Sequence, residues 1–371
     1  MTSLRAATLQ LFDRLKDDSA DVDAEYVVAP SSIHEAAAIL AAAAEAGMPT
    51  AFRGGGTHQG YGTPVPADLV LTTSRLNTIT DWQPDDLTVV VQAGVPIDVL
   101  EAEIATRRQT AVFPETTSRS TVGGSVAIGL SGYRRLRFGP TRDRVLQVRM
   151  ATGYGKVITG GSPVVKSSTG YGLPRLVTGS LGSLGMIGEM TLKLWSEPMA
   201  VATVEVGDAA AALRDLYRPL AVLETSEGSL VYLGGPESQI TAESERFGSA
   251  LRRGLAWPEP ISEPIQLELR VPAAQLASAV EWMTRLGAIR WIAQHGVGII
   301  SGGFDDFDAE GFTGARSWSE SVGGALVVTA GPRESFDPWG SPPSSIEIQR
   351  RIKDAFDPAG VCNPSILAGH L

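Results

Sequence analysis

The sequence predicts an α+β fold in which a small parallel β-α-β sheet, an antiparallel sheet and a smaller α/β domain follow one another. Strand, helix and strand patterns alternate in the first part of the chain. Strand patterns broken by glycine fill residues 121–194, and the glycine density falls after Glu197-Pro198. The 371 residues leave room for more than one domain, because a domain usually has roughly 100–200 residues.

The first β-α-β unit begins with a strand at residues 26–30. Residues 31–47 are predicted to be a helix, because Ser32 and Glu35 have the spacing of a capping box and Gly47 stands where a helix would end. The strand that follows runs straight into three adjacent glycines. This order of elements is typical of a parallel sheet.

A similar unit comes next along the chain. Residues 87–94 are predicted to be a strand, residues 95–108 a helix opened by Pro96, and residues 110–114 a short strand. We expect this unit to form a parallel sheet as the first one does.

The following stretch is predicted to be antiparallel. Residues 145–151 and 156–160 flank a Thr-Gly-Tyr-Gly turn and predict a hairpin. Apolar and polar residues alternate from Met186 to Trp195, which predicts a strand with one buried face.

Three segments follow from these patterns. The predicted segments are an N-terminal domain at 1–197, a small α/β cap domain at 198–335 and a C-terminal segment at 336–371 that returns to the first domain. Within the cap the predicted elements are a strand and a helix at 201–220, strands at 229–235 and 264–272, and a helix at 273–287. A last helix is predicted at 342–358.

Composition narrows the classes of function. The net charge of −10 disfavours a nucleic-acid binder, which would carry a basic surface. A single cysteine, Cys362, excludes a disulfide framework and fits a reducing cytoplasm. The first residues show no apolar signal segment, and no run of about 18 apolar residues predicts a membrane span.

Three glycine-rich sites are candidates for binding a ligand. Residues 53–60 place three glycines after a strand, where backbone N–H groups can converge on an anion such as a pyrophosphate; a flexible turn is the alternative. Residues 121–127 are small enough for a flat ligand to lie on the main chain; a tight packing corner is the alternative. Residues 179–188 lead into a strand, so they match neither the Rossmann fingerprint nor a P-loop.

Taken in order, these segments resemble a known family. The runs RGGGT, TVGGSVA, GPTRDRVLQVRMATGYGKVI and KSSTGYGLPRLVTGSLGSLGMIGEMTLKL are similar to the PCMH-type FAD-binding domain of the vanillyl-alcohol-oxidase group. The run FDPAGVCNP is similar to the closing segment of that family. The resemblance covers residues 26–197 and 345–365.

The resemblance implies a cofactor and its contacts. FAD would be bound, and the protein would supply binding and electrostatics to the redox chemistry of the flavin. The implied contacts group around the pyrophosphate, along the cofactor, at the adenine end and near the flavin ring. In that order they are Arg53, Gly54, Gly55, Gly56, Thr57 and His58; Thr121, Gly123, Gly124, Ser125 and Ala127; Gly185 and Ile187; and Pro114, Thr116 and Asn363.

Two departures distinguish the chain from the catalytic relatives. Those relatives carry a histidine cluster that binds a metal, whereas the four histidines here have no ligand spacing, so no metal site is predicted. They also carry an arginine where this chain has Val165, beside Lys166. The short second domain and the pair Arg134-Arg135 instead resemble the E-type FAD-binding subunit of glycolate oxidases, although Ser365 replaces the usual closing glycine.

Individual side chains allow more than one interpretation. Lys166, Tyr171 and His295 are the candidates for catalysis, with core or surface roles as alternatives. His58 can serve a phosphate or anchor the flavin covalently, although the anchoring histidine of relatives lies one place earlier. For Cys362 we favour a buried, inert thiol. Glu115 and the pair Asp85-Asp86 are predicted to be solvated, and Trp282 and Trp291 to lie in a core or an interface.

The resemblance favours a subunit with non-covalent FAD in a glycolate-oxidase-like complex that oxidises a small 2-hydroxy acid. Electrons would pass through the flavin to a partner, the implied partners being a larger FAD subunit and an iron–sulfur subunit. The complex would be cytoplasmic, with any attachment to a membrane made through those partners. Two alternatives stay open: a stand-alone FAD oxidoreductase for another alcohol or hydroxy acid, and a flavin-free structural subunit.

Overall fold

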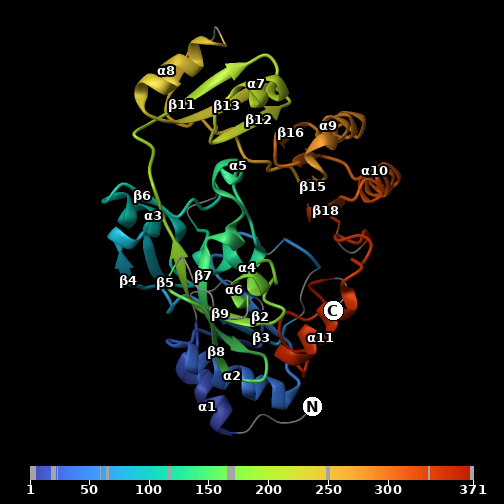
Figure 1. The fold of residues 1–371 in the computed structure, drawn as a ribbon. Coiled ribbons are helices and arrows are strands. Elements are labelled where there is room, and N and C mark those ends of the chain that lie inside the picture. The colour runs from blue at the N-terminus through green and yellow to red at the C-terminus, as the bar shows by residue number, and fades with distance from the viewer. Residues whose placement is uncertain are drawn as a thin grey trace.

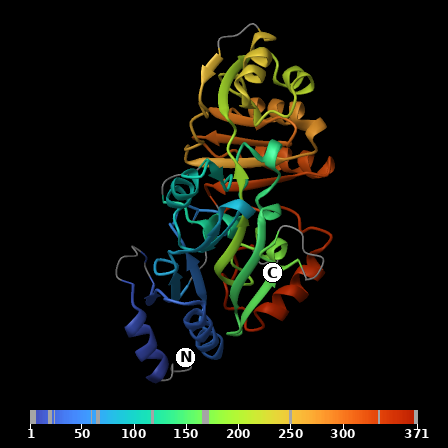
Figure 2. The same cartoon turned by 60° about the vertical axis from the view of Figure 1, so that its left-hand side comes forward.

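The structure is a computed structural model that describes residues 6–17, 22, 24–58, 60–63, 67–115, 119–164, 172–247, 251–332 and 335–367. Figure 1 shows an eight-stranded sheet with its helices at the top and the remaining sheets below it. The last helix, α11 (Ile346–Phe356), returns to the lower part, beside the green strands of the N-terminal half (Figure 2). The α+β prediction is confirmed.

The parallel sheet has three strands in the order β1 (Tyr26–Val28), β3 (Leu69–Thr72) and β2 (Thr50–Arg53). Helices α1 (Ala6–Leu15) and α2 (Ile33–Ala46) bury apolar side chains against it. The first predicted unit is therefore present, with β3 inserted between its two strands.

Helix α2 begins and ends where the sequence predicts. The Ser32 side chain accepts a hydrogen bond from the Glu35 backbone N–H, and Gly47 caps the other end with a left-handed φ of 62°. The Glu35 carboxylate bonds the backbone and hydroxyl of Ser31, one residue before the expected partner in a capping box.

The larger sheet below the eight-stranded one is antiparallel. Its order is β4 (Ile79–Gln83), β5 (Thr88–Gln92), β9 (Gly185–Lys193), β7 (Val145–Thr152) and β8 (Val157–Gly161). Strands β7 and β8 form the predicted hairpin. Helices that pack on the sheet around one core are α3 (Ile97–Ala105), α4 (Val122–Ile128) and α6 (Leu173–Val177).

The second predicted β-α-β unit is wrong in its pairing. β5 lies antiparallel between β4 and β9, and β6 (Gln109–Thr110) pairs antiparallel with β10 (Trp195–Ser196). A strand pattern gives no direction for its neighbours, and the partners β9 and β10 come far later in the chain. β9 is also buried on both faces for most of its length rather than on one, because α2 and α4 both contact it.

All eight strands of the upper sheet are antiparallel, in the order β14-β11-β13-β12-β16-β17-β15-β18. The strands are β11 (Ala200–Val206), β12 (Ala221–Thr225), β13 (Gly228–Gly235), β14 (Leu251–Arg253), β15 (Ile265–Arg270), β16 (Arg290–Gln294), β17 (Ile299–Phe304) and β18 (Ala325–Ala330). Its helices are α7 (Ala209–Asp215), α8 (Glu237–Glu245), α9 (Leu276–Arg285) and α10 (Ala309–Ser321).

Short helices complete the chain. They are α5 (Arg135–Phe138), η1 (Pro84–Asp86), η2 (Thr141–Asp143) and η3 (Ala273–Gln275). No helix in the described ranges is long and apolar enough to cross a membrane.

The cap of α2 predicts a measurable loss of stability. Ser32→Ala removes the acceptor of the Glu35 N–H and is expected to lower the free energy of unfolding by about 1 kcal/mol. Urea denaturation followed by circular dichroism measures the difference. Ser226→Ala, at an exposed side chain in the turn between β12 and β13, is the control; equal losses in both variants would contradict the capping role.

Candidate cofactor site

A cavity opens where β2 ends. It holds about 1070 Å³ of empty space, its open mouth included, and lies among the glycine turn after Arg53, helix α4 and the turn at residues 181–187. The carboxyl ends of parallel strands are a common place for cofactors.

Glycine forms much of the cavity wall because side chains have no room there. A Cβ on Gly54 would lie 2.2 Å from the Thr121 hydroxyl oxygen, and one on Gly55 would lie 1.5 Å from the Arg119 carbonyl oxygen. The two segments therefore approach each other through their main chains, which leaves backbone groups facing the cavity.

Residues 121–127 form both a tight packing corner and part of the cavity wall, the two interpretations that their sequence allowed. Thr121 caps helix α4 by accepting a hydrogen bond from the Gly124 N–H at 3.2 Å. Gly123 is a packing corner, since a Cβ there would lie 2.5 Å from the Ala93 Cβ. All three of these α4 residues also line the cavity.

Two hydroxyl groups in the cavity lack partners. The Oγ of Ser125 and the Oγ1 of Thr63 are buried, and neither has a hydrogen-bond partner in the described structure. Buried polar groups are nearly always paired, so each indicates a ligand with polar atoms at this place. A long cofactor that carries phosphates and hydroxyls fits such a wall.

His58 lies at the rim of the same cavity. Its Nδ1 is 2.8 Å from the Thr57 hydroxyl, which is itself 3.1 Å from the Ser120 hydroxyl. Burial lowers the pKa of His58, so the imidazole is neutral at neutral pH.

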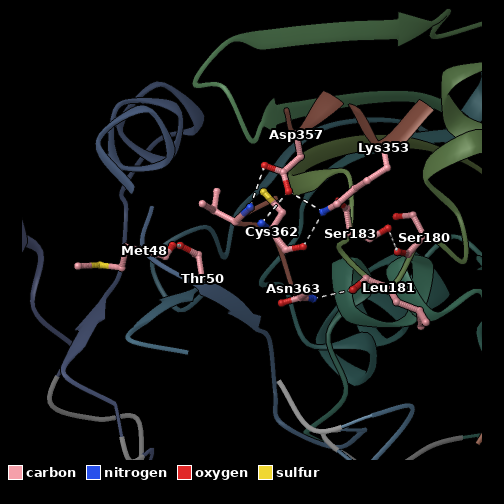
Figure 3. Close-up of polar contacts among 10 residues, drawn as sticks. Met48, Thr50, Ser180, Leu181, Ser183, Lys353, Asp357, Cys362 and Asn363 are labelled. Carbon is pink, nitrogen blue, oxygen red and sulfur yellow. Dashed lines mark hydrogen bonds and ion pairs between the residues drawn. The ribbon is translucent and has the colours of Figure 1, made fainter. Parts of the chain in front are cut away.

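The segment at residues 357–363, which we call the C-terminal strap, contributes Asn363 to the cavity wall, and Figure 3 shows its polar contacts. It lies beside β2, where Thr50 and Cys362 form a parallel bridge. Asn363 has a positive φ of 40° and joins two walls of the cavity. Its side-chain oxygen accepts from the Phe52 N–H at 3.0 Å, and its amide nitrogen donates to the Leu181 carbonyl at 2.6 Å.

A buried ion pair holds the strap. Lys353 of α11 donates to the carboxylate of Asp357, to the Ser183 carbonyl at 2.7 Å and to the Cys362 carbonyl at 3.0 Å (Figure 3). The other contacts of the Asp357 carboxylate are the N–H groups of Val361 and Cys362. The pair is thus satisfied almost wholly by main-chain groups of the strap and the turn at 181–187.

Most of the residues implied as FAD contacts gather in this one cavity. Pro114 is outside its lining and packs against Gly132 instead. Thr116, Val165, Lys166 and Tyr171 are outside the described residues. The residues brought together are Arg53, Gly54, Gly55, Gly56, Thr57, His58, Thr121, Gly123, Gly124, Ser125, Ala127, Gly185, Ile187 and Asn363.

His295 is not part of the cavity lining. It follows β16 and lies 2.8 Å from the Glu224 carboxylate of β12. In the part of the chain that the structure describes, no three His, Cys, Asp or Glu side chains gather as metal ligands.

Some functional candidates were missed by sequence reasoning. Tyr61 and Thr63 line the cavity without belonging to a glycine motif, and Lys353 carried no signal beyond its spacing of four residues from Asp357.

The prediction that Glu115 is solvated is wrong, because its side chain is 14% exposed and paired with Arg134 at 3.0 Å. Cys362 is fully buried, and burial raises the pKa of its thiol.

Comparison with known proteins shows similarity to a domain family over part of the chain. Residues 24–161 match the FAD binding domain family. Glycolate oxidase subunit GlcE of Escherichia coli is 27% identical over 320 residues, which cover 79% of this chain and 85% of that subunit. An uncharacterized FAD-linked oxidoreductase of Mycobacterium tuberculosis is 34% identical over 171 residues, or 46% of this chain.

The extent of these matches differs. The chain spans 37% of the length of the Mycobacterium tuberculosis protein and 39% of a D-lactate dehydrogenase of Archaeoglobus fulgidus, to which it is 33% identical over 173 residues. Among solved structures, an alkyldihydroxyacetonephosphate synthase has a TM-score of 0.65 at 17% identity, covering 91% of this chain and 75% of that one. That likeness shows the fold.

The strap predicts a large effect of a single substitution. Lys353→Met leaves the Asp357 carboxylate buried without its cation, and the free energy of unfolding is expected to fall by roughly 3–5 kcal/mol. Chemical denaturation measures it.

Arg350→Met on the same helix is the matched control. It breaks an exposed pair with Glu347, which is expected to contribute about 1 kcal/mol at most. A Lys353→Met variant as stable as this control would show that the buried pair does not hold the strap.

Proposed function

The chain carries an FAD-binding domain at residues 24–161, as the resemblance predicted, and on that premise we propose that it oxidises a small 2-hydroxy acid as a subunit of a glycolate-oxidase-like complex. Its similarity to a glycolate oxidase subunit over 79% of the chain, and to D-lactate dehydrogenases over shorter stretches, supports this substrate class.

The observation that carries the proposal is the glycine-walled cavity with its two unpartnered hydroxyls. Gly54 to Gly56 would face the pyrophosphate with their backbone, and Ser125 would bond a polar atom of the cofactor. FAD supplies the two-electron oxidation of an alcohol carbon. The protein binds and orients the cofactor, and the buried walls exclude water from it.

The remaining contacts are proposed by position along the same cavity. Arg53, Thr57 and His58 would stand at the pyrophosphate, Thr121, Gly123, Gly124 and Ala127 along the cofactor, Gly185 and Ile187 at the adenine end, and Asn363 towards the flavin. Pro114 and Thr116 are proposed near the flavin from the resemblance alone. We propose non-covalent binding, because Thr57 occupies the place of the anchoring histidine of covalent relatives.

The flavin proposal predicts yellow protein whose colour is released by acid. Purified chain is expected to absorb at about 370 and 450 nm, which are the flavin's own bands. After acid precipitation the released flavin, and with it these bands, is expected in the supernatant. Ser125→Ala is expected to bind FAD about tenfold more weakly, because it removes one hydrogen bond, while apoprotein stability stays equal or rises, because an unpaired buried hydroxyl is lost.

The control is Ser319→Ala, which changes a buried serine of α10, a helix of the upper sheet, and should leave FAD affinity unchanged. Affinity comes from fluorescence titration of the apoprotein. A chain that takes up no FAD even when it is added would remove the proposal and favour a structural subunit. Bands that stay with the acid pellet would contradict non-covalent binding.

Membership in a complex is a separate prediction. Tagged chain expressed in its own cell is expected to co-purify with a larger flavin subunit and an iron–sulfur subunit that accepts the electrons, detected by mass spectrometry of the eluate. An untagged strain corrects for background. If tagged chain elutes alone and still reduces its flavin with a hydroxy acid, the subunit role is wrong and the stand-alone enzyme is favoured.

A further inference from the structure

The upper sheet turns a polar face towards the cofactor cavity. Along β15, Leu267 and Leu269 pack into the core with α9 and α10, so Glu268 and Arg270 point to the opposite face. There the Arg270 guanidinium donates to the hydroxyl of Tyr61 at 2.6 Å, and Tyr61 lines the cavity. This face of the sheet therefore meets the cavity at its rim.

A second contact supports the same placement. Val327 of β18 lies directly opposite Glu268 in the sheet register and thus on the same face. Its side chain is buried with Tyr61 and Leu181, both from the cavity wall.

Gln294 belongs to this polar face as well. Arg270 lies opposite Ile299, and Ile299 lies opposite Gln294, so the three side chains share one face. Two strand spacings separate Arg270 and Gln294, roughly 10 Å between Cα atoms. Gln294 is 7% exposed, and its side-chain oxygen has no hydrogen-bond partner in the described structure.

Helix α5 covers the next part of the same face. Its neighbourhood contributes Tyr133 and Phe138 to a cluster with Leu223 and Ile292, and Leu223 lies opposite Gln294. The Gly296 turn after β16 also touches α5, since a Cβ there would lie 2.8 Å from Leu136.

Arg135 of α5 is a half-buried cation near the entrance to this face. Within the ranges that the structure describes, its guanidinium makes no hydrogen bond and no ion pair. Burial is the main cause that lowers the pKa of Arg135, followed by the positive charges of Arg142 and Arg270, with Glu268 and Asp143 opposing them. A half-buried guanidinium that is not engaged in an ion pair can bind an anion through its N–H groups.

We propose that Arg135, Arg270 and Gln294 form a binding site for a small 2-hydroxy carboxylate at the rim of the cofactor cavity. The Arg135 guanidinium suits a carboxylate, and Arg270, which also pairs with Glu268 and Tyr61, adds positive charge beside it. The side-chain oxygen of Gln294 accepts a hydrogen bond from the hydroxyl of the ligand. The role of this site in oxidation rests on the proposed function. In that role, this chain itself binds the substrate.

The test is isothermal titration calorimetry of the FAD-loaded chain with two carboxylates that cannot be oxidised. 2-Methylpropanoate offers the carboxylate alone, and 2-hydroxy-2-methylpropanoate adds a hydroxyl on a carbon without hydrogen. Arg135→Met and Arg270→Met are expected to weaken both ligands by about tenfold or more. Gln294→Leu is expected to weaken only the hydroxylated ligand.

The variants separate binding from folding. Arg135 makes no hydrogen bond or ion pair through its guanidinium among the described residues, so Arg135→Met is expected to keep its melting temperature while it loses the ligands. Arg285→Met removes a cation from α9, on the other face of the same sheet, and should bind both carboxylates as the unaltered protein does.

Two results would overturn the site: carboxylates that bind Arg135→Met as tightly as the unaltered chain, or an unaltered FAD-loaded chain that binds neither. FAD content is read from the absorbance of the same samples. A chain that takes up no FAD but loses carboxylate binding in Arg135→Met would contradict the proposed function and leave the anion site standing.

Discussion

The buried ion pair between Lys353 and Asp357 is the interaction on which the cofactor cavity depends. Its main-chain hydrogen bonds tie α11, the strap and the turn at Ser183 together, and the strap then positions Asn363 between Phe52 and Leu181. Two walls that come from distant parts of the chain are thereby held at a fixed separation. Removing either charge would leave the other buried without its counter-charge, so the pair either holds the whole arrangement or fails as a unit.

The upper sheet depends on this arrangement in turn. Tyr61 follows the glycine turn and reaches Arg270, while Val327 packs on Leu181, whose carbonyl accepts the hydrogen bond from Asn363. Helix α5 adds an apolar connection through Phe138. The ring centroids of Phe138 and Trp195 are 5.3 Å apart, and Phe138 also packs in a cluster with strands of the upper sheet. These contacts join the sheet to the walls of the cavity, and they therefore position the polar face of the sheet over the cavity.

Local chemistry could be predicted from the sequence, and pairing over distance could not. The Ser32 cap, the Gly47 end of α2, the β7–β8 hairpin and the glycine segments depend on neighbouring residues, so spacing and residue type suffice. The partner of β5, the burial of Glu115 and the role of Lys353 depend on residues far along the chain. Gln294 gave no signal either, because an unsatisfied oxygen is visible only once its surroundings are known.

The bond between Phe52 and Asn363 joins residues 311 positions apart, which makes the cofactor pocket one of the most non-local parts of the topology. Contacts of such separation form late, since the loop they close costs entropy before they are made. During synthesis the glycine turn leaves the ribosome long before the strap is made. Until then the backbone N–H groups of the turn have neither the strap beside them nor a bound ligand. Cofactor capture therefore belongs to the final stage of folding, after translation has passed residue 363.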